Sequence, residues 1–260
     1  MKKIIIFPVV LLLILVVSGC GRDDSQLKEI RNRGVLRVGI KVDVPGFGYL
    51  NPDTKKIEGL EIDLTKMIAQ ELLGNSEAVE LSGITAQTRG PMLDNGELDI
   101  VIATFTITEE RKKLFNFTEP YFHDEIGLLV RKDSGLKGIM DMDGKTVGVA
   151  TSGTAYGAII VESEKRGIQM NFRRYASYPE IKAALLVGEI DAFSVDKSIL
   201  CGYIDDSTII LKEGFSPQDY GIATRLDNKQ LAVFLDRFIK DIKKDGRLED
   251  ILTRWGQILP

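Results

Sequence analysis

The chain is poor in the residues that build metal centres and disulfides. Its 260 residues include two cysteines, one histidine and one tryptophan. His123 has no evident metal or base partner in the sequence, and no Cys/His cluster has the spacing of a zinc site. The sequence also lacks a P-loop, a GxGxxG fingerprint and a GxSxG nucleophile elbow. We therefore expect no metal, no cofactor and no catalytic residue.

A membrane-spanning run and an excess of positive charge are also missing. The apolar run over residues 4–17 follows Lys2 and Lys3, and it is too short to span a bilayer comfortably. It ends at Cys20, in a pattern that resembles a bacterial lipobox. We expect a signal peptide over residues 1–19, a lipidated Cys20 and a tether over residues 20–26; an ordinary secretory signal with an incidental cysteine is the alternative.

The mature chain is acidic. Removal of residues 1–19 takes away two of the 34 basic side chains and leaves 32 against 38 acidic ones, a balance of −6. A nucleic-acid-binding protein usually has the opposite sign. With Cys20 lipidated, Cys201 has no partner for a disulfide within the chain, and its apolar neighbours Ile199 and Leu200 predict a buried thiol.

Strands and helices alternate along the rest of the chain. Apolar strand patterns alternate with helical ones from residue 35 to residue 103, and the alternation repeats from residue 146 to residue 195. Two amphipathic helices close the chain. The pattern predicts an α/β protein of two similar lobes, and ligands of open α/β sheets gather at the carboxyl ends of the strands.

The predicted strand ends carry a distinctive set of side chains. The set holds three cations, one anion, several hydroxyls and two aromatic rings, and it suits a small ligand with net negative charge and one positive group. The candidate ligand-binding residues are Lys41, Arg89, Thr104, Phe105, Thr106, Arg111, Thr151, Gly153, Thr154, Tyr178 and Asp196.

Arg111 and Asp196 carry most of this hypothesis. Thr108 is the expected N-cap of a helix that contains Arg111, and a guanidinium beside free helical amides can bind a carboxylate. The amides of Gly153 and Thr154 can complete that clamp, or simply begin a helix. Asp196 either caps the helix that starts at residue 197 or pairs with an ammonium group of the ligand.

Several separated motifs resemble family 3 extracellular solute-binding proteins, the receptors of polar amino-acid ABC importers. The motifs occupy residues 59–64, 99–101, 106–111 and 117–121. Four further segments are similar to the aspartate/glutamate-binding branch of that family, at residues 38–41, 88–91, 103–108 and 191–198.

The resemblance implies a type II periplasmic-binding-protein-like fold, in which each lobe is a mostly parallel sheet with flanking helices. Lobe 1 would comprise residues 27–128 and 219–260, and lobe 2 residues 129–218. Two crossover strands, near residues 126–130 and 220–223, would form the hinge.

The resemblance also implies a role for each residue. Arg111 and the amides of Thr106 and Thr154 would hold the α-carboxylate of the ligand. Asp196 and the carbonyl of Thr104 would hold its α-ammonium. A side-chain carboxylate would face Lys41, Arg89 and Tyr178. The segment 151–155 varies among members of the family.

The expected protein is thus a monomeric, lipid-anchored receptor outside the cytoplasm, which delivers glutamate or aspartate to the permease and ATPase subunits of an importer. Glutamine or another polar amino acid is the near alternative. A dehydratase-like enzyme on the same scaffold and a surface adhesin are the alternatives from other classes.

Overall fold

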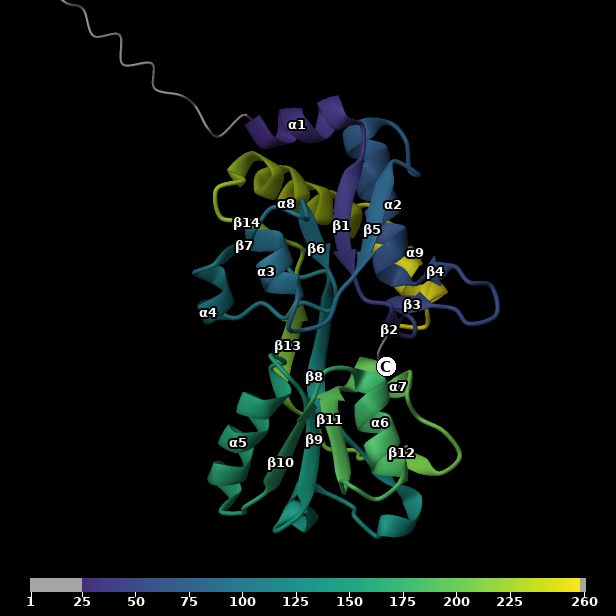
Figure 1. Ribbon diagram of the computed structural model, residues 1–260, viewed down its shortest axis with the longest axis vertical. Helices are drawn as coiled ribbons and strands as arrows, with labels where there is room; N and C mark the ends of the chain where they lie inside the picture. The colour runs from purple at the N-terminus through teal and green to yellow at the C-terminus, as the bar shows by residue number, and fades with distance from the viewer. Residues whose placement is uncertain (1–24, 258–260) are drawn as a thin grey trace, which may run out of the picture.

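The computed structural model describes residues 25–257, which form two lobes joined by two long strands (Figure 1). The predicted signal peptide, Cys20 and most of the predicted tether lie outside the described residues. Within the described part of the chain, no helix is both long enough and apolar enough to cross a membrane.

Lobe 1 is built on a five-stranded sheet of order β5-β1-β6-β14-β7. The strands are β1 (Leu36–Ile40), β5 (Val79–Gly83), β6 (Ile100–Ile102), β7 (Phe115–Phe117) and β14 (Ala223–Arg225). Strands β5, β1 and β6 are parallel, whereas β14 runs antiparallel to both of its neighbours. A small antiparallel sheet of β2 (Asp43–Val44), β3 (Gly48–Leu50) and β4 (Ile57–Glu58) lies beside it.

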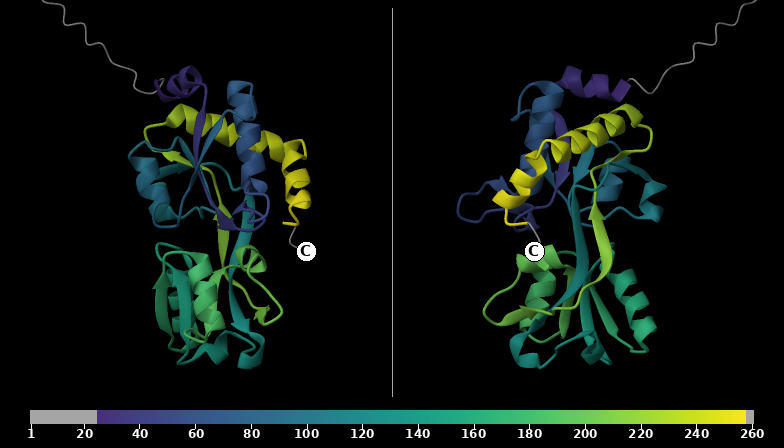
Figure 2. Two further views of the ribbon diagram at one scale, coloured as in Figure 1. Left: turned by 45° about the vertical axis from the view of Figure 1, so that its right-hand side comes forward. Right: turned by 180° about the vertical axis from the view of Figure 1, so that it is seen from behind.

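Six helices accompany the lobe 1 sheet among the described residues: α1 (Ser25–Arg33), α2 (Leu60–Leu73), α3 (Arg89–Asp94), α4 (Glu109–Lys112), α8 (Lys229–Lys244) and α9 (Arg247–Arg254). Figure 2 shows α8 crossing the end of the lobe farthest from lobe 2. The amphipathic pattern of α8 buries Leu231, Leu235, Phe238 and Ile242 against the core, as the spacing predicts.

Lobe 2 has a sheet of order β10-β9-β11-β8-β12, and β13 also pairs with β8. Its strands are β8 (Phe122–Arg131), β9 (Thr146–Ala150), β10 (Asn171–Tyr175), β11 (Ala192–Asp196), β12 (Thr208–Ile210) and β13 (Phe215–Tyr220). The helices are α5 (Ala155–Arg166), α6 (Tyr178–Leu186) and α7 (Lys197–Cys201), with 3-10 turns η2 (Lys132–Ser134) and η3 (Ile139–Met142).

The lobes are connected by β8 and β13, which pair antiparallel from Phe122–Tyr220 to Ile126–Phe215. Residues 126–130 of β8 pair with β11 inside the lobe 2 sheet. The prediction that places the first crossover at residues 126–130 is therefore wrong by a few residues, because that stretch is already a strand of lobe 2. Cys201 is also exposed rather than buried, since it ends the short helix α7.

Candidate functional site

The predicted site residues converge where the two lobes face each other. Lys41 follows β1, residues 104–106 follow β6, residues 151–154 connect β9 to α5, and Asp196 ends β11. Seven of the eleven candidates line one partly enclosed interlobe cavity, which measures about 10 Å³: Arg89, Thr104, Thr106, Gly153, Thr154, Tyr178 and Asp196. Of the others, Lys41, Phe105 and Arg111 contact lining residues, as described below, whereas the amide of Thr151 is bonded to the carbonyl of Tyr175.

The floor of the cavity is formed at Thr104, which has a left-handed backbone with φ of 43°. A residue that sequence reasoning missed holds this conformation: Oε1 of the fully buried Glu61 accepts the amide of Thr104 at 2.6 Å and the hydroxyl of Tyr121 at 2.5 Å. Burial raises the pKa of Glu61 to about 7. Glu61 lies in the motif at residues 59–64, but nothing local indicates this role, because its partners lie 43 and 60 positions further along the chain.

Two arginines share the ring of Phe105. The guanidinium carbons of Arg89 and Arg111 lie 4.0 and 4.8 Å from the ring centroid. Arg89 also donates from Nη1 to the carbonyls of Ala103 at 3.0 Å and Thr104 at 3.3 Å. Burial lowers the pKa of both arginines, and that of Arg111 falls to about 9. A guanidinium is not deprotonated in proteins near neutral pH.

Arg111 is placed as the capping pattern predicts. Thr108 is the N-cap of α4, and its Oγ1 accepts the amide of Arg111 at 3.2 Å. The guanidinium then donates to the carbonyl of Thr106 at 2.7 Å and, across the cleft, to that of Ser152 at 3.3 Å. Arg111 is therefore a cation that contacts both lobes beside the cavity.

The backbone beside Arg111 leaves two amide donors available. Within the described chain, the amides of Thr106 and Thr154 have no recorded acceptor, whereas the amide of Gly153 is engaged by the carbonyl of Ala150 at 3.2 Å. Thr154 is the N-cap of α5 without a side-chain capping bond, and its hydroxyl instead donates to Oε1 of Gln218 at 2.7 Å. The guanidinium of Arg111, bonded to the carbonyls of Thr106 and Ser152, thus lies beside two free amides of the cavity lining, and together they form the kind of donor set that a carboxylate accepts.

Lys41 lies at the opposite side of the site and is almost fully buried. Its Nζ is 2.8 Å from Oδ1 of Asp43 and 4.6 Å from the centroid of the Tyr178 ring. Desolvation lowers the pKa of Lys41, while the Asp43 charge opposes that shift. Asp43 is a second residue that sequence reasoning missed, and it offsets one of the three predicted cations.

Asp196 does not cap the helix that follows it. The amide of Ser198 in α7 donates to Oδ2 of Asp124 at 3.1 Å, and the side chain of Asp196 makes no capping bond. The buried Asp196 carboxyl instead lines the cavity and accepts the hydroxyl of Tyr220. Burial first, and the neighbouring Asp124 second, raise the pKa of Asp196 to about 7. Of the two possibilities left open by the sequence, the structure leaves the carboxyl available to a ligand.

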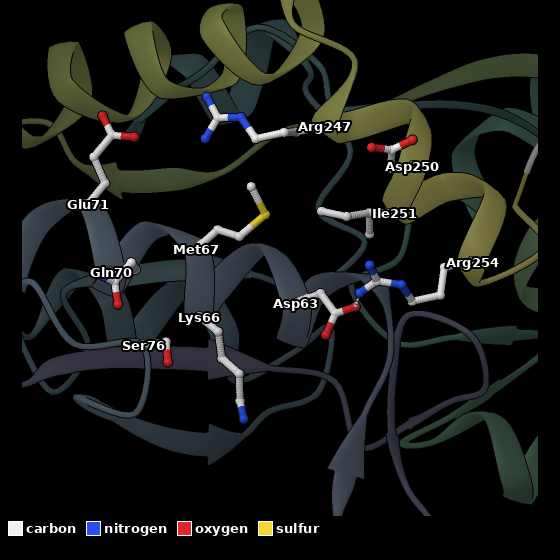
Figure 3. Close-up of a pocket in the computed structure, with 10 residues that line it drawn as sticks. All are labelled: Asp63, Lys66, Met67, Gln70, Glu71, Ser76, Arg247, Asp250, Ile251 and Arg254. Atoms are coloured by element: carbon white, nitrogen blue, oxygen red, sulfur yellow. Dashed lines mark hydrogen bonds and ion pairs between the residues drawn. The ribbon is translucent and has the colours of Figure 1, made fainter.

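A much larger groove lies elsewhere, between α2 and α9 in lobe 1, and measures about 860 Å³ (Figure 3). Four of its charged side chains already form ion pairs: Asp63 binds Arg254 at 3.0 Å, Lys66 binds Glu77, and Arg247 binds Asp245. The groove is open, and none of the predicted site residues lines it. No group of three metal-ligating side chains occurs within residues 25–257.

The fold and the interlobe cavity define a two-lobed periplasmic binding protein of type II. The profile of the family described as bacterial extracellular solute-binding proteins, family 3, matches residues 36–258, and the chain belongs to that family. Proteins named for binding glutamine, cystine and glutamate are among its relatives.

Three comparisons illustrate the relatedness. The chain is 33% identical to the ABC transporter glutamine-binding protein GlnH of Bacillus subtilis over 98% of this chain and 97% of that protein. It is 28% identical to the glutamate-binding protein GluB of Corynebacterium glutamicum, over 91% and 84% of the two chains. A mutant of the arginine-binding protein ArgBP of T. maritima has a similar structure, with a TM-score of 0.79 and 30% identity, over 88% and 98% of the two chains.

Proposed function

We propose that this protein is the substrate-binding receptor of an amino-acid ABC importer and that it captures glutamate or aspartate between its lobes. The observation that supports this most strongly is the opposition of Arg111, with the free amides of Thr106 and Thr154, to the buried carboxyl of Asp196. An α-amino acid carries the complementary pair of groups on one carbon. The α-carboxylate would bind to the first set and the α-ammonium to Asp196 and the Thr104 carbonyl.

The balance of buried charge favours an acidic side chain on the ligand. At the predicted side-chain end of the site, Lys41 and Arg89 contribute two positive charges and Asp43 contributes one negative charge. Protonation keeps Glu61 neutral below pH 7. One positive charge then remains for a side-chain carboxylate near Lys41 and Arg89. An ionised Glu61 would cancel that charge and favour glutamine, which the Bacillus relative is named for binding.

Capture would proceed by closure of the lobes around β8 and β13. Thr154, Tyr178 and Asp196 of lobe 2 would close on a ligand held by lobe 1, exclude water and so strengthen each charge pair. A transport receptor must also release its ligand, so we expect a dissociation constant near 1 μM, about −8 kcal/mol. The closed form would dock on the permease. We propose Cys20 as the lipid anchor that keeps a monomeric receptor at the membrane.

The α-carboxylate assignment is tested by Arg111→Ala. We expect this variant to lose measurable binding of every amino acid, because it removes the cation common to all of these complexes. The measurement is titration calorimetry of the purified protein against aspartate, glutamate, glutamine, cysteine, histidine and arginine. Lys112→Ala is the matched control, since Lys112 is the next residue of α4 and pairs only with the exposed Glu109 among the described residues. An Arg111→Ala protein that keeps full affinity would exclude the assignment.

The acidic preference is tested at Arg89. Arg89→Gln retains a donor for the carbonyl of Ala103 but removes the charge, so the ratio of glutamate to glutamine affinity should fall at least about tenfold while some general affinity remains. Arg237→Gln, on α8 and remote from the cavity, should leave the ratio unchanged. Equal binding of glutamate and glutamine by the unmutated protein would contradict the assignment and favour the glutamine alternative.

A further inference from the structure

A tyrosine hydroxyl lies between two buried carboxyl groups at the base of the cleft. Tyr220 is fully buried in β13; its hydroxyl bonds Oδ2 of Asp196 at the end of β11 and lies 3.2 Å from Oδ2 of Asp124 in β8. Asp124 and Asp196 are 7% and 4% exposed. Because β8 and β13 are the strands that join the lobes, this cluster connects the hinge to the predicted ammonium site.

This cluster contains too few hydrogen-bond donors to satisfy two ionised carboxylates. Asp124 accepts the amide and hydroxyl of Ser198 and the amide of Glu125. Tyr220 has a single hydroxyl hydrogen, which it donates to Asp196. No hydrogen is then left between the Tyr220 oxygen and Oδ2 of Asp124, which are 3.2 Å apart. One additional proton on the carboxyl pair makes that contact a hydrogen bond. Two carboxylates in a shared buried site characteristically retain such a proton.

The surrounding positive charges do not neutralise the carboxyl pair in place of this proton. Arg89 from α3 and Arg111 from α4 act on Asp196 at a distance, and Tyr178 from α6 is neutral. Lys197 from α7 binds Glu125 at 2.6 Å instead. In the described part of the chain, neither Asp124 nor Asp196 forms a direct ion pair with a lysine or arginine. Burial is the first cause that raises the pKa of each carboxyl.

We propose that Asp124 and Tyr220 are positioning residues for ligand capture: they direct Asp196 toward the cleft and hold with it one proton, which leaves when the α-ammonium of the ligand binds. The ammonium donates an N–H to Asp196, and the displaced proton passes to the buffer. Ligand and proton therefore compete for Asp196. This inference rests on the proposed function, but it concerns the α-ammonium and so applies to glutamate and glutamine alike.

Calorimetry tests the proton release directly. Glutamate is titrated into the purified protein between pH 5.5 and 8.5, in pairs of buffers that differ in their enthalpy of ionisation. We expect close to one proton released per ligand at pH 6, a release that approaches zero at pH 8.5, and an affinity that falls up to tenfold per pH unit on the acid side. Because Glu61 also titrates near pH 7, the same series in Glu61→Gln removes its contribution.

Two substitutions should shift the pH dependence of proton release in opposite directions. Asp124→Asn removes the second carboxylate, so Asp196 ionises at lower pH and less proton is released at pH 6. Tyr220→Phe removes the hydrogen bond that stabilises ionised Asp196, so the midpoint rises and release persists at higher pH. Ser198→Ala removes one donor to Asp124 and should also raise the midpoint, which keeps the test available if Asp124→Asn does not fold.

Tyr175→Phe is the control, because the buried Tyr175 hydroxyl has no recorded partner in the described structure. It should change neither affinity nor proton release. Amino-acid binding without proton release from pH 5.5 to 8.5 overturns the inference and leaves the proposed function standing. The same holds if the variants weaken binding equally at every pH. Absence of binding for all amino acids at all pH values instead overturns the proposed function.

Discussion

At the scale of single residues, the site depends on carboxyl groups that water does not reach. Glu61, Asp124 and Asp196 are each less than 10% exposed, and burial raises the pKa of all three. A buried carboxyl with a raised pKa binds a proton in the folded state over a pH range in which the unfolded chain has released it. The free energy of unfolding therefore falls as pH rises through that range.

Glu61 gives the clearest case. Its pKa rises from 4.5 to about 7, so its contribution to the free energy of unfolding should fall by about 3 kcal/mol between pH 4.5 and pH 7. Glu61→Gln keeps an oxygen acceptor for Thr104 and Tyr121 but cannot ionise. The contribution of residue 61 to the pH dependence of the free energy of unfolding should therefore disappear. Urea unfolding of the ligand-free protein at several pH values measures it. The exposed Glu77→Gln is the control, and a slope unchanged in Glu61→Gln would contradict the assignment.

Residue types at strand ends indicated much of the site, but not its supporting groups. Arg111 and Asp196 were predicted because a cap pattern precedes one and an apolar strand precedes the other. Glu61, Asp124 and Tyr220 were not predicted, because each has a function only through partners more than 20 positions away. Local spacing contains no information about which distant strand supplies a hydroxyl or an amide.

At the scale of elements, the predicted N-cap of α4 is confirmed, and the residues at other helix ends are equally local signals. Thr108 caps α4, Gly74 ends α2 in a left-handed conformation, and Pro179 lies in the first turn of α6. The small sheet of β2, β3 and β4 and the antiparallel pairing of β8 with β13 were not predicted. The strands of the small sheet are only two or three residues long, and β8 and β13 lie far apart in the sequence, so their assignment depends on long-range pairing rather than on alternation.

The two ends of α2 should respond very differently to the same substitution. Gly59 has φ of 139°, and a Cβ added there would lie 2.1 Å from the carbonyl oxygen of Phe47. Gly59→Ala should therefore lower the free energy of unfolding by more than about 3 kcal/mol or displace the loop before α2. At Gly74, φ is 74° and a Cβ would meet nothing within 4 Å, so Gly74→Ala should cost about 1 kcal/mol. Urea denaturation of the pair measures both, and equal losses would contradict this account.

At the scale of the whole molecule, few direct bonds cross between the lobes, and each lies at the cleft. The hydroxyl of Tyr203 in lobe 2 donates to the carbonyl of Asp43 in lobe 1, Lys41 lies over the ring of Tyr178, and Arg111 reaches Ser152. Each lobe has its own sheet and covering helices, so opening of the cleft would expose mainly these contacts. The affinity for the ligand and the closure of the lobes are therefore coupled through a small set of side chains.

Tyr203→Phe isolates one of these contacts. The substitution keeps the ring that packs on Tyr178 and Phe193 and removes only the hydroxyl that reaches across to Asp43. Loss of one interlobe hydrogen bond, worth about 1 kcal/mol, should weaken glutamate binding about fivefold. The free energy of unfolding should change little without ligand, because in an open form both groups are hydrated. Calorimetry measures the affinity, and small-angle X-ray scattering with and without glutamate measures the decrease in radius of gyration on closure.

Tyr156→Phe is the matched control for this hydroxyl deletion, since Tyr156 packs on Phe172 and Arg174 within lobe 2. Its affinity should equal that of the unmutated protein. If Tyr203→Phe weakens binding while saturating glutamate still produces the full decrease in radius of gyration, the hydroxyl stabilises the closed form without being required to reach it. If affinity is unchanged, the Tyr203–Asp43 bond does not contribute to closure, and the coupling must depend on Arg111 and Lys41, the two cations through which the ligand itself would join the lobes.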